Sequence, residues 1–290
     1  MNGAGAFARP EFISAFRDFT AWRGQCVGLT GERGVLGGLL RERFAAEGIA
    51  CEAYPGDIND PAALAAWFAG RTFSQFYHFA ALVPVAHVEA DPLLAYQTNV
   101  IGTYNVCRQL LLTQRQCWLF HCSSSHVYQP TATPVPISEQ AATVPPSFYG
   151  RTKLAAEDVV RTLLTRLDVP HCIGRVFSFS HARQAPPYLV PSLRQRIGAL
   201  PPGATLQVDN PSAVRDIQDA EYVIDAILHL ARKRATGTVN IGTGVGRSVR
   251  DIARALAREA GRDIDVAGAE REPAGSLIAD TGRLRALIGA

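Results

Sequence analysis

The chain has 290 residues, 47% of them hydrophobic, which is enough apolar material to bury a large core. Its 29 basic and 26 acidic side chains leave a formal net charge of +3, and no run of five like charges occurs. Neither a nucleic-acid surface nor a membrane patch is therefore expected. The composition excludes a disordered or fibrous protein and favours a globular protein whose partners are small molecules.

The cysteines, the histidines and the N-terminus narrow the class further. The six cysteines form no C-x-x-C pair and mostly lie in apolar runs, where a thiol behaves as a small buried side chain. The seven histidines lack the spacing of metal ligands, so no metal site is expected. No basic-then-apolar leader begins the chain, and no uninterrupted apolar run reaches the length of about 18 residues that a membrane span needs. We expect a reduced, cytoplasmic protein.

The first 24 residues precede the first expected strand. Five large apolar side chains recur there at roughly helical spacing: Phe12, Ile13, Phe16, Phe19 and Trp22. This pattern predicts an amphipathic helix over residues 10–22 that packs on the core. Residues 1–24 are thus expected to form an N-terminal helical extension.

After this extension, short apolar runs alternate with helical patterns. That order of elements builds a parallel sheet with helices on both faces. Strands are expected at residues 26–30, 50–54, 75–79, 117–122 and 171–177, and helices near 35–47, 61–70, 92–114 and 147–167.

Beyond residue 177 the pattern changes. Residues 178–187 are polar and rich in proline, a helix is expected over 189–199 and a short strand over 205–208, and the alternation resumes over 218–232, 238–241 and 249–260. We predict a first domain over residues 25–177 and a smaller domain over 178–290. The two are expected to interleave, with residues 216–242 returning to the first domain.

A glycine-rich turn follows the first expected strand. Gly31, Gly34 and Gly37 separate this strand from a helical pattern. Strand, glycine turn and helix form the context in which backbone N–H groups and a helix N-terminus hold a pyrophosphate. The first domain is therefore expected to bind a dinucleotide.

Tyr149 and Lys153 lie four residues apart in a segment expected to be helical. At that spacing both side chains share one face of the helix, so both can act on the same reacting atom. Because the chain has only two lysines and eight tyrosines, coincidence is a poor explanation for the pair. Ser124, at the end of an apolar run 25 residues earlier, offers a hydroxyl that can join the phenol in polarising a carbonyl group.

These motifs, with His78-Phe79-Ala80-Ala81 and Asn99-Val100-x-Gly102-Thr103, resemble the extended short-chain dehydrogenase/reductase family of nucleotide-sugar enzymes. The resemblance covers nearly the whole chain after residue 24. It implies an α/β fold, a Rossmann-like doubly wound parallel sheet with a smaller C-terminal substrate domain. It also implies that Ser124, Tyr149 and Lys153 are catalytic.

The same resemblance implies a nicotinamide dinucleotide cofactor. The residues expected to contact it are Gly31, Arg33, Gly34, Val35, Leu36, Gly37, Asp57, Ile58, Ala80, Ala81, Leu82, Asn99, Tyr149, Lys153 and Val176. The Lys153 ammonium and an oxidised nicotinamide ring are expected to bring the pKa of Tyr149 down from about 10 towards working pH.

No Asp or Glu closes the second expected strand to bind a ribose 2′-hydroxyl, as NAD sites usually require. Arg33, inside the glycine turn, could instead face a 2′-phosphate. NADP(H) is therefore favoured, with NAD(H) as the alternative.

Residues 208–216 resemble the segment of GDP-4-dehydro-6-deoxy-mannose reductases and GDP-mannose dehydratases whose arginine clamps the diphosphate. Arg215 takes that place, and a guanidinium suits it because it meets phosphate oxygens in pairs. The alternative is a structural Arg215–Asp216 pair in a surface loop. Substrate contacts are expected from Ser125, His126, Ser178, Arg183, Val190, Asn210 and Arg215.

Two departures from the family pattern bear on the substrate. Dehydratases of this superfamily carry an Asp-Glu pair directly after the active-site hydroxyl, whereas this chain has Ser125 and His126, so 4,6-dehydration is disfavoured. His126 either contacts the substrate or is a loop histidine bonded to the backbone. Ser178 occupies a place where relatives usually carry an asparagine.

The expected activity is reduction of the 4-keto group of a nucleotide-activated 6-deoxyhexose, with GDP as the preferred nucleotide. The first alternative is a 4-epimerase with tightly bound NAD. The second is a non-catalytic dinucleotide-binding protein, which would not need Tyr149 and Lys153. The resemblance also implies a homodimer formed by helices 92–114 and 147–167, with which Leu110, Leu111 and Leu112 are compatible.

Overall fold

The computed structural model describes residue 7 and residues 11–201, 203–270 and 274–289. Its main element is a six-stranded sheet in the order β2-β1-β3-β4-β5-β9, in which every neighbouring pair is parallel. The strands are β1 (Cys26–Thr30), β2 (Ala50–Ala53), β3 (Gln75–His78), β4 (Trp118–Ser124), β5 (His171–Val176) and β9 (Gly237–Ile241). Because the strand order reverses at β1, the sheet is doubly wound, and the predicted Rossmann-like fold is confirmed.

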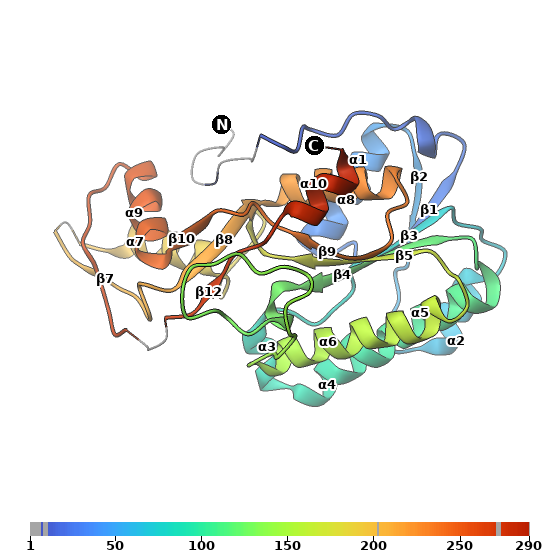
Figure 1. Cartoon of the computed structure of the whole chain (residues 1–290), viewed down its shortest axis with the longest axis horizontal. Helices are drawn as coiled ribbons and strands as arrows, with labels where there is room; N and C mark the ends of the chain where they lie inside the picture. Colours follow the sequence, from blue (N-terminus) through green and yellow to red (C-terminus); the bar gives the residue numbers. More distant parts are fainter. Residues whose placement is uncertain (1–6, 8–10, 202, 271–273, 290) are drawn as a thin grey trace.

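Helices cover both faces of this sheet (Figure 1). One face carries α1 (Val35–Ala46), α8 (Ala220–Arg232) and α10 (Gly282–Ile288). The other carries α2 (Pro61–Phe68), α3 (Val85–Ala90), α4 (Pro92–Tyr96), α5 (Gly102–Thr113) and α6 (Phe148–Val160). Each face has its own apolar cluster, one with Leu29 and Trp118, the other with Phe76 and Leu119, so the strands are apolar on both sides.

The long helices expected near 92–114 and 147–167 are present, each with a π-helical segment. Gln97–Ile101 joins α4 to α5, and Arg161–Thr165 continues α6. No helix in the described part of the chain is long and apolar enough to cross a membrane.

A smaller lobe lies beyond one end of the main sheet (Figure 1). Its strands are β6 (Ser178–Ser180), β8 (Val214–Asp219), β10 (Gly246–Ser248) and β12 (Ser276–Leu277), with β8 at the centre, and a separate pair, β7 (Leu206–Gln207) and β11 (Val266–Ala267). Its helices are α7 (Leu189–Ala199) and α9 (Val249–Glu259), which pack through an apolar cluster that includes Leu193 and Leu256.

The chain passes from this lobe back to the main sheet. β8 pairs in the small sheet, whereas β9, which follows α8, pairs with β5 in the main one. This crossing supports the proposed interleaving of residues 216–242, although their first few residues belong to the smaller sheet. The division into domains at residue 177 stays a prediction.

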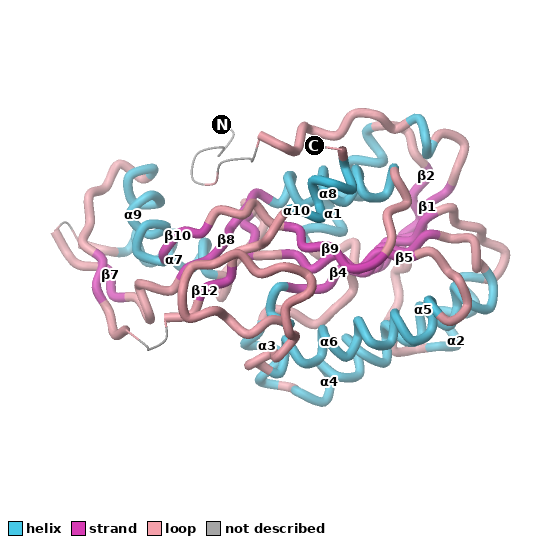
Figure 2. Tube along the Cα trace, in the orientation of Figure 1, coloured by secondary structure: helices cyan, strands magenta, loops and turns pink. Residues whose placement is uncertain are grey.

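The predicted helix over residues 10–22 is wrong wherever this segment is described; residue 10 itself lies outside the described residues. Only Thr20–Trp22 forms a short 3-10 turn, and the rest is loop (Figure 2). The Phe16 N–H donates to the Asp225 carboxylate at 3.0 Å, and the Trp22 indole N–H donates to Gln75 at 2.8 Å. Because its hydrogen bonds and apolar side chains are directed at distant elements, the segment forms a strap across the sheet's helices and not a helix of its own.

Candidate active site

The glycine turn lies at the carboxyl edge of the main sheet, directly after β1. Gly31 has φ +81°, and a Cβ added there would lie 2.6 Å from the Ala80 backbone nitrogen. A Cβ at Gly37 would lie 2.2 Å from the Gly31 carbonyl oxygen. Gly34 caps α1, so the N–H groups of Val35 and Leu36 belong to the first turn of this helix. The turn is a backbone cradle at a helix N-terminus, which fits a pyrophosphate.

Asn99 connects the loop after β3 to helix α6. Its side-chain oxygen accepts from the Leu82 N–H at 2.7 Å, and its amide nitrogen donates to the Leu82 carbonyl at 3.3 Å and to the Thr152 hydroxyl at 3.0 Å. Thr152 is the residue before Lys153. Asn99 therefore fixes the segment Ala80–Leu82 relative to the helix that carries Lys153.

A second buried chain of contacts lies under the glycine turn. The Thr30 hydroxyl is 2.6 Å from Nδ1 of His78, and Nε2 of His78 is 3.0 Å from the Thr103 hydroxyl. Burial lowers the pKa of His78 to about 3, with a smaller contribution from the Lys153 charge, so the imidazole is neutral. Sequence reasoning used His78 only as part of a motif and missed this role in holding the end of β1.

Ser124, Tyr149 and Lys153 converge beside the turn. Ser124 ends β4, and its side chain lies close enough to the Tyr149 phenol to lower the pKa of that phenol. Helix α6 begins after Ser147, whose hydroxyl accepts from the Gly150 N–H, so Tyr149 lies in the first turn and Lys153 one turn later. Lys153 is only 4% exposed, and its ammonium donates to the Cys122 carbonyl at 2.7 Å. A carbonyl group placed here would meet two hydroxyls and a nearby cation.

The pKa of Tyr149 shifts in the direction opposite to the expected one. In the chain alone, burial raises the pKa of Tyr149 above its ordinary range, and the hydrogen bond with Ser124 lowers it only in part. The expected fall in its pKa is thus not a property of the chain by itself, because removal of the phenolate from water outweighs the neighbouring groups. Burial also lowers the pKa of Lys153, opposed by Cys122 and by the Glu157 carboxylate.

His126 lies beside Tyr149 and near Arg215. The His126 ring is edge-on to the Tyr149 ring with centroids 5.5 Å apart, and the backbone N–H of His126 donates to the Ser124 hydroxyl. Burial, and then the charge of Arg215, lower the pKa of His126 to about 4, so it is neutral at pH 7.

Arg215 donates to the backbone carbonyls of Val214 and Gly275, at 2.8 and 3.0 Å. The Asp216 carboxylate accepts instead from Thr243, Gly244 and Ala279, so the alternative of an Arg215–Asp216 pair is wrong.

The remaining expected cofactor residues take varied positions. Arg33 is exposed in the glycine turn, Asp57 is exposed after β2, and Val176 ends β5. Ile58 is 4% exposed, and a Cβ at Gly102 would lie 2.5 Å from its side chain.

The remaining expected substrate residues divide into two groups. Ser125 is buried directly after Ser124, and Ser178 begins β6, which pairs with the strand that carries Arg215. The other three have partners elsewhere: Arg183 forms a bidentate ion pair with Glu42 on α1, Val190 is 3% exposed in the core of the smaller lobe, and the Asn210 side chain donates to the Ala274 carbonyl.

Tyr188 is a further residue of the site that sequence reasoning missed. It is half-buried, precedes α7, and lies close enough to Tyr149 to contribute to the raised pKa of that phenol. Its place in a proline-rich loop carries no spacing signal, so only the folded chain identifies it.

Comparison with known proteins places this geometry in a family. The family model described as GDP-mannose 4,6 dehydratase matches residues 40–285. UDP-glucose 4-epimerase of Halalkalibacterium halodurans is 27% identical over 81% of this chain and 76% of that protein. UDP-glucose 4-epimerase 2 of Oryza sativa subsp. japonica is 29% identical over 77% of this chain and 59% of that protein.

Two solved structures share the fold. RMD from Pseudomonas aeruginosa complexed with NADPH superimposes with a TM-score of 0.81 at 23% identity, over 91% of this chain and 92% of that one. UDP-glucose 4-epimerase from Thermus thermophilus in complex with NAD gives 0.79 at 22% identity, over 90% of this chain and 92% of that one. Since the family model covers far more than half of the sequence, the chain belongs to the extended short-chain dehydrogenase/reductase family of nucleotide-sugar epimerases, dehydratases and reductases.

Proposed function

We propose that the chain reduces the 4-keto group of a nucleotide-diphosphate 6-deoxyhexose with NADPH, and that GDP is the preferred nucleotide. The observation that carries this proposal is the convergence of the Ser124 and Tyr149 side chains one helical turn from Lys153, beside a glycine cradle. These groups are those needed to hold a ketone oxygen and protonate it.

The chain's own groups supply the acid chemistry. Bound NADPH would supply the hydride. Ser124 and Tyr149 hold the carbonyl oxygen, and Tyr149, which burial keeps protonated, gives it a proton. The Lys153 ammonium, held by the Cys122 carbonyl, stabilises the phenolate that remains.

Elimination of water is disfavoured at this site. The two residues after Ser124 are Ser125, which is 2% exposed, and His126, which is neutral at pH 7. Neither is a carboxylic acid. The acid and base that a 4,6-dehydration needs therefore do not stand where dehydratases of the superfamily carry them.

The end of β2 supports NADPH over NADH. The strand ends at Ala53 and is followed by buried Tyr54, so no carboxylate closes it. Glu52 is bound to Arg71 at 2.6 Å. The exposed Arg33 remains as a cation near the expected ribose, where a 2′-phosphate would bind.

Arg215 supports a diphosphate-linked substrate. Burial lowers the pKa of its guanidinium, and the hydrogen bonds described for its side chain go to backbone carbonyls. A cation that is partly removed from water, with no carboxylate in contact among the described residues, is suited to bind an anion such as a diphosphate.

A 4-epimerase is the second candidate, favoured by the curated epimerases that match most of this chain. Ser124, Tyr149 and Lys153 would serve it equally. Two measurements separate the candidates. A reductase consumes NADPH stoichiometrically with a nucleoside-diphosphate 4-keto-6-deoxyhexose and purifies with exchangeable cofactor. If none of these sugars consumes NADPH and mass spectrometry finds tightly bound NAD, the reductase proposal fails and the epimerase stands.

We also propose that two copies associate through α4 and α5. This face exposes large apolar side chains: Leu93 (69%), Tyr96 (45%), Ile101 (44%), Tyr104 (41%) and Leu112 (64%). Leu110 and Leu111 are instead buried, at 0% and 8%. Light scattering after size exclusion should give a dimer that the double change Leu93→Glu and Tyr104→Glu converts to a monomer; a wild-type monomer at micromolar concentration would remove this proposal.

A further inference from the structure

A fully buried carboxylate lies one helical turn beyond Lys153. Glu157 of α6 is 0% exposed, and the Ser123 hydroxyl donates to one of its oxygens at 2.5 Å. Arg175 of β5 donates to both oxygens, at 3.0 and 2.8 Å, and Arg161 also pairs with it. Although burial opposes ionisation, Arg175 and Ser123 hold the pKa of Glu157 below its ordinary value. Glu157 is therefore an ionised carboxylate, and both of its oxygens have hydrogen-bond donors.

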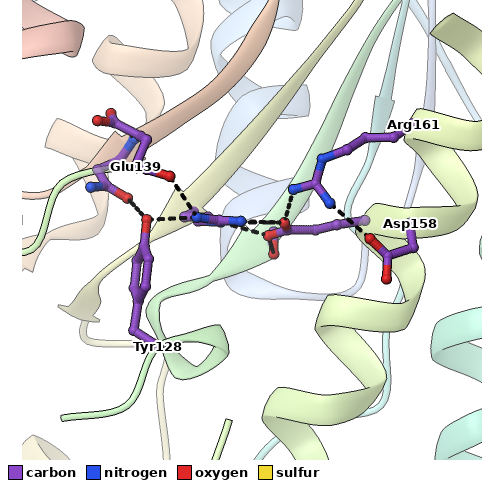
Figure 3. A network of polar contacts seen from close by, with 8 residues as sticks. Tyr128, Glu139, Asp158 and Arg161 are labelled. Carbon is purple, nitrogen blue, oxygen red and sulfur yellow. Dashed lines mark hydrogen bonds and ion pairs between the residues drawn. The ribbon is translucent and has the colours of Figure 1, made fainter. Parts of the chain in front are cut away.

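The network extends from Glu157 across β5 to β9, the edge strand of the main sheet. Arg175 donates to the Tyr128 hydroxyl at 2.8 Å, and Tyr128 donates to the Asn240 side chain, also at 2.8 Å. The Asn240 N–H donates in turn to Glu139. Figure 3 shows Tyr128 and Glu139 at one end of these contacts and Arg161 and Asp158 at the other. The network thus has a helix end, formed by Glu157, and a sheet end, formed by Tyr128 and Asn240.

In the described part of the chain, two side-chain hydrogen bonds join β4 to α6: the Ser123 hydroxyl donates to Glu157, and the Lys153 ammonium donates to the Cys122 carbonyl. Ser123 precedes Ser124 on β4, and Glu157 follows Lys153 on α6. Arg175 donates to the same carboxylate, but it lies on β5, and Tyr128 contacts Arg175 and not Glu157. A hydrogen bond to an ionised carboxylate is strong and directional, so this contact, together with the Lys153–Cys122 hydrogen bond, sets how far along β4 the helix lies.

We propose that the Ser123–Glu157 hydrogen bond is a positioning contact that holds β4 and α6 in register, and so keeps the Ser124 hydroxyl next to the Tyr149 phenol. The catalytic value of this contact rests on the proposed function; its effect on the Tyr149 hydrogen bond does not. Misplacement of a reacting group by a fraction of an ångström is enough to slow a positioned proton transfer.

Ser123→Ala removes the contact while leaving Glu157 paired with both arginines. Tyr128→Phe is the matched control, because it deletes one hydroxyl of the same buried network without touching β4 or α6 at this contact. The primary readout is the NMR shift of the Tyr149 ring carbon that bears the hydroxyl, in protein labelled at that carbon of tyrosine. Tyr149→Phe assigns the signal, and Ser124→Ala gives its position when the Ser124–Tyr149 bond is absent.

We expect Ser123→Ala to move the Tyr149 signal towards its position in Ser124→Ala, and Tyr128→Phe to leave it in place. In the reductase assay, Ser123→Ala should lower kcat about tenfold with KM within about twofold, while Tyr128→Phe keeps kcat within about twofold. An unmoved signal in Ser123→Ala, or an equal shift in Tyr128→Phe, overturns the inference. If the wild-type protein reduces no sugar, the proposed function fails, and the NMR comparison still decides the positioning role.

Discussion

Arg215 offers a sharp test of the diphosphate site, because its structural role and its proposed binding role predict different outcomes. The change Arg215→Met keeps an unbranched apolar stem and removes the charge. It deletes hydrogen bonds to the Val214 and Gly275 carbonyls but also removes a cation whose pKa burial lowers. These effects oppose each other, so the free energy of unfolding should change by no more than about 1 kcal/mol.

Binding should respond much more strongly. A guanidinium that donates two charge-assisted hydrogen bonds to a diphosphate contributes roughly 3 kcal/mol, so the affinity of Arg215→Met for a GDP-sugar should fall about 100-fold. Isothermal titration calorimetry with GDP-mannose, and with UDP-glucose for comparison, measures this fall directly. Urea unfolding of the same samples confirms that the fold is intact.

Arg183→Met is the matched control. Its side chain pairs with Glu42 through two 2.8 Å contacts, both partners being about half exposed. An exposed pair of this kind contributes about 0–1 kcal/mol to stability, and its loss should leave nucleotide-sugar affinity within about twofold. Affinity of Arg215→Met within threefold of wild type, or an equal loss in Arg183→Met, would refute the assignment of Arg215 to the diphosphate.

Three further outcomes follow from the same structure. Gly37→Ala, whose added Cβ would lie 2.2 Å from the Gly31 oxygen, should weaken NADPH binding at least about tenfold by fluorescence titration, whereas Gly198→Ala, with nothing within 4 Å, should not. Trp22→Ala, at a side chain that is 0% exposed, should lower the free energy of unfolding by about 3–5 kcal/mol in urea; a loss under about 1 kcal/mol would contradict the strap's role in the core. His126 takes up a proton near its ordinary pKa of 6.5 when unfolded but only near pH 4 when folded, so the free energy of unfolding should fall as pH falls between these values. His126→Asn should reduce that slope in urea unfolding measured from about pH 7 to about pH 4, and an unchanged slope would contradict the burial of the imidazole.

The parts of the fold and site that sequence predicts well depend on local spacing. Tyr149 and Lys153 are one helical turn apart wherever that segment is helical, and Gly31 and Gly37 enclose a turn between a strand and a helix. An apolar run ending at a serine places Ser124 at a strand end. Because the carboxyl ends of parallel strands share one edge, such residues meet without any knowledge of long-range contacts.

The parts that sequence missed depend on partners far along the chain. Apolar side chains at about every third residue fit one face of a helix. They fit equally well an extended segment whose Phe16 N–H donates to Asp225, 209 residues away. Arg183 forms its ion pair with Glu42, which lies 141 residues away in the sequence. No pattern within a window of about 18 residues contains either partner, so periodicity alone had no means to choose between the two forms.

Asp216 explains how the two halves of the proposed site can share one substrate. Its buried carboxylate accepts from Thr243 and Gly244, which lie two and three residues after β9 of the main sheet, and from Ala279 near the end of the chain. Arg215 is its neighbour on β8, the central strand of the smaller lobe. The carboxylate therefore fastens the strand that carries Arg215 to the sheet that carries Ser124. Because buried charge-assisted hydrogen bonds resist displacement, the distance between Arg215 and the hydroxyls of Ser124 and Tyr149 is set within the protein. Under the proposed function, that distance would select a sugar nucleotide of matching length.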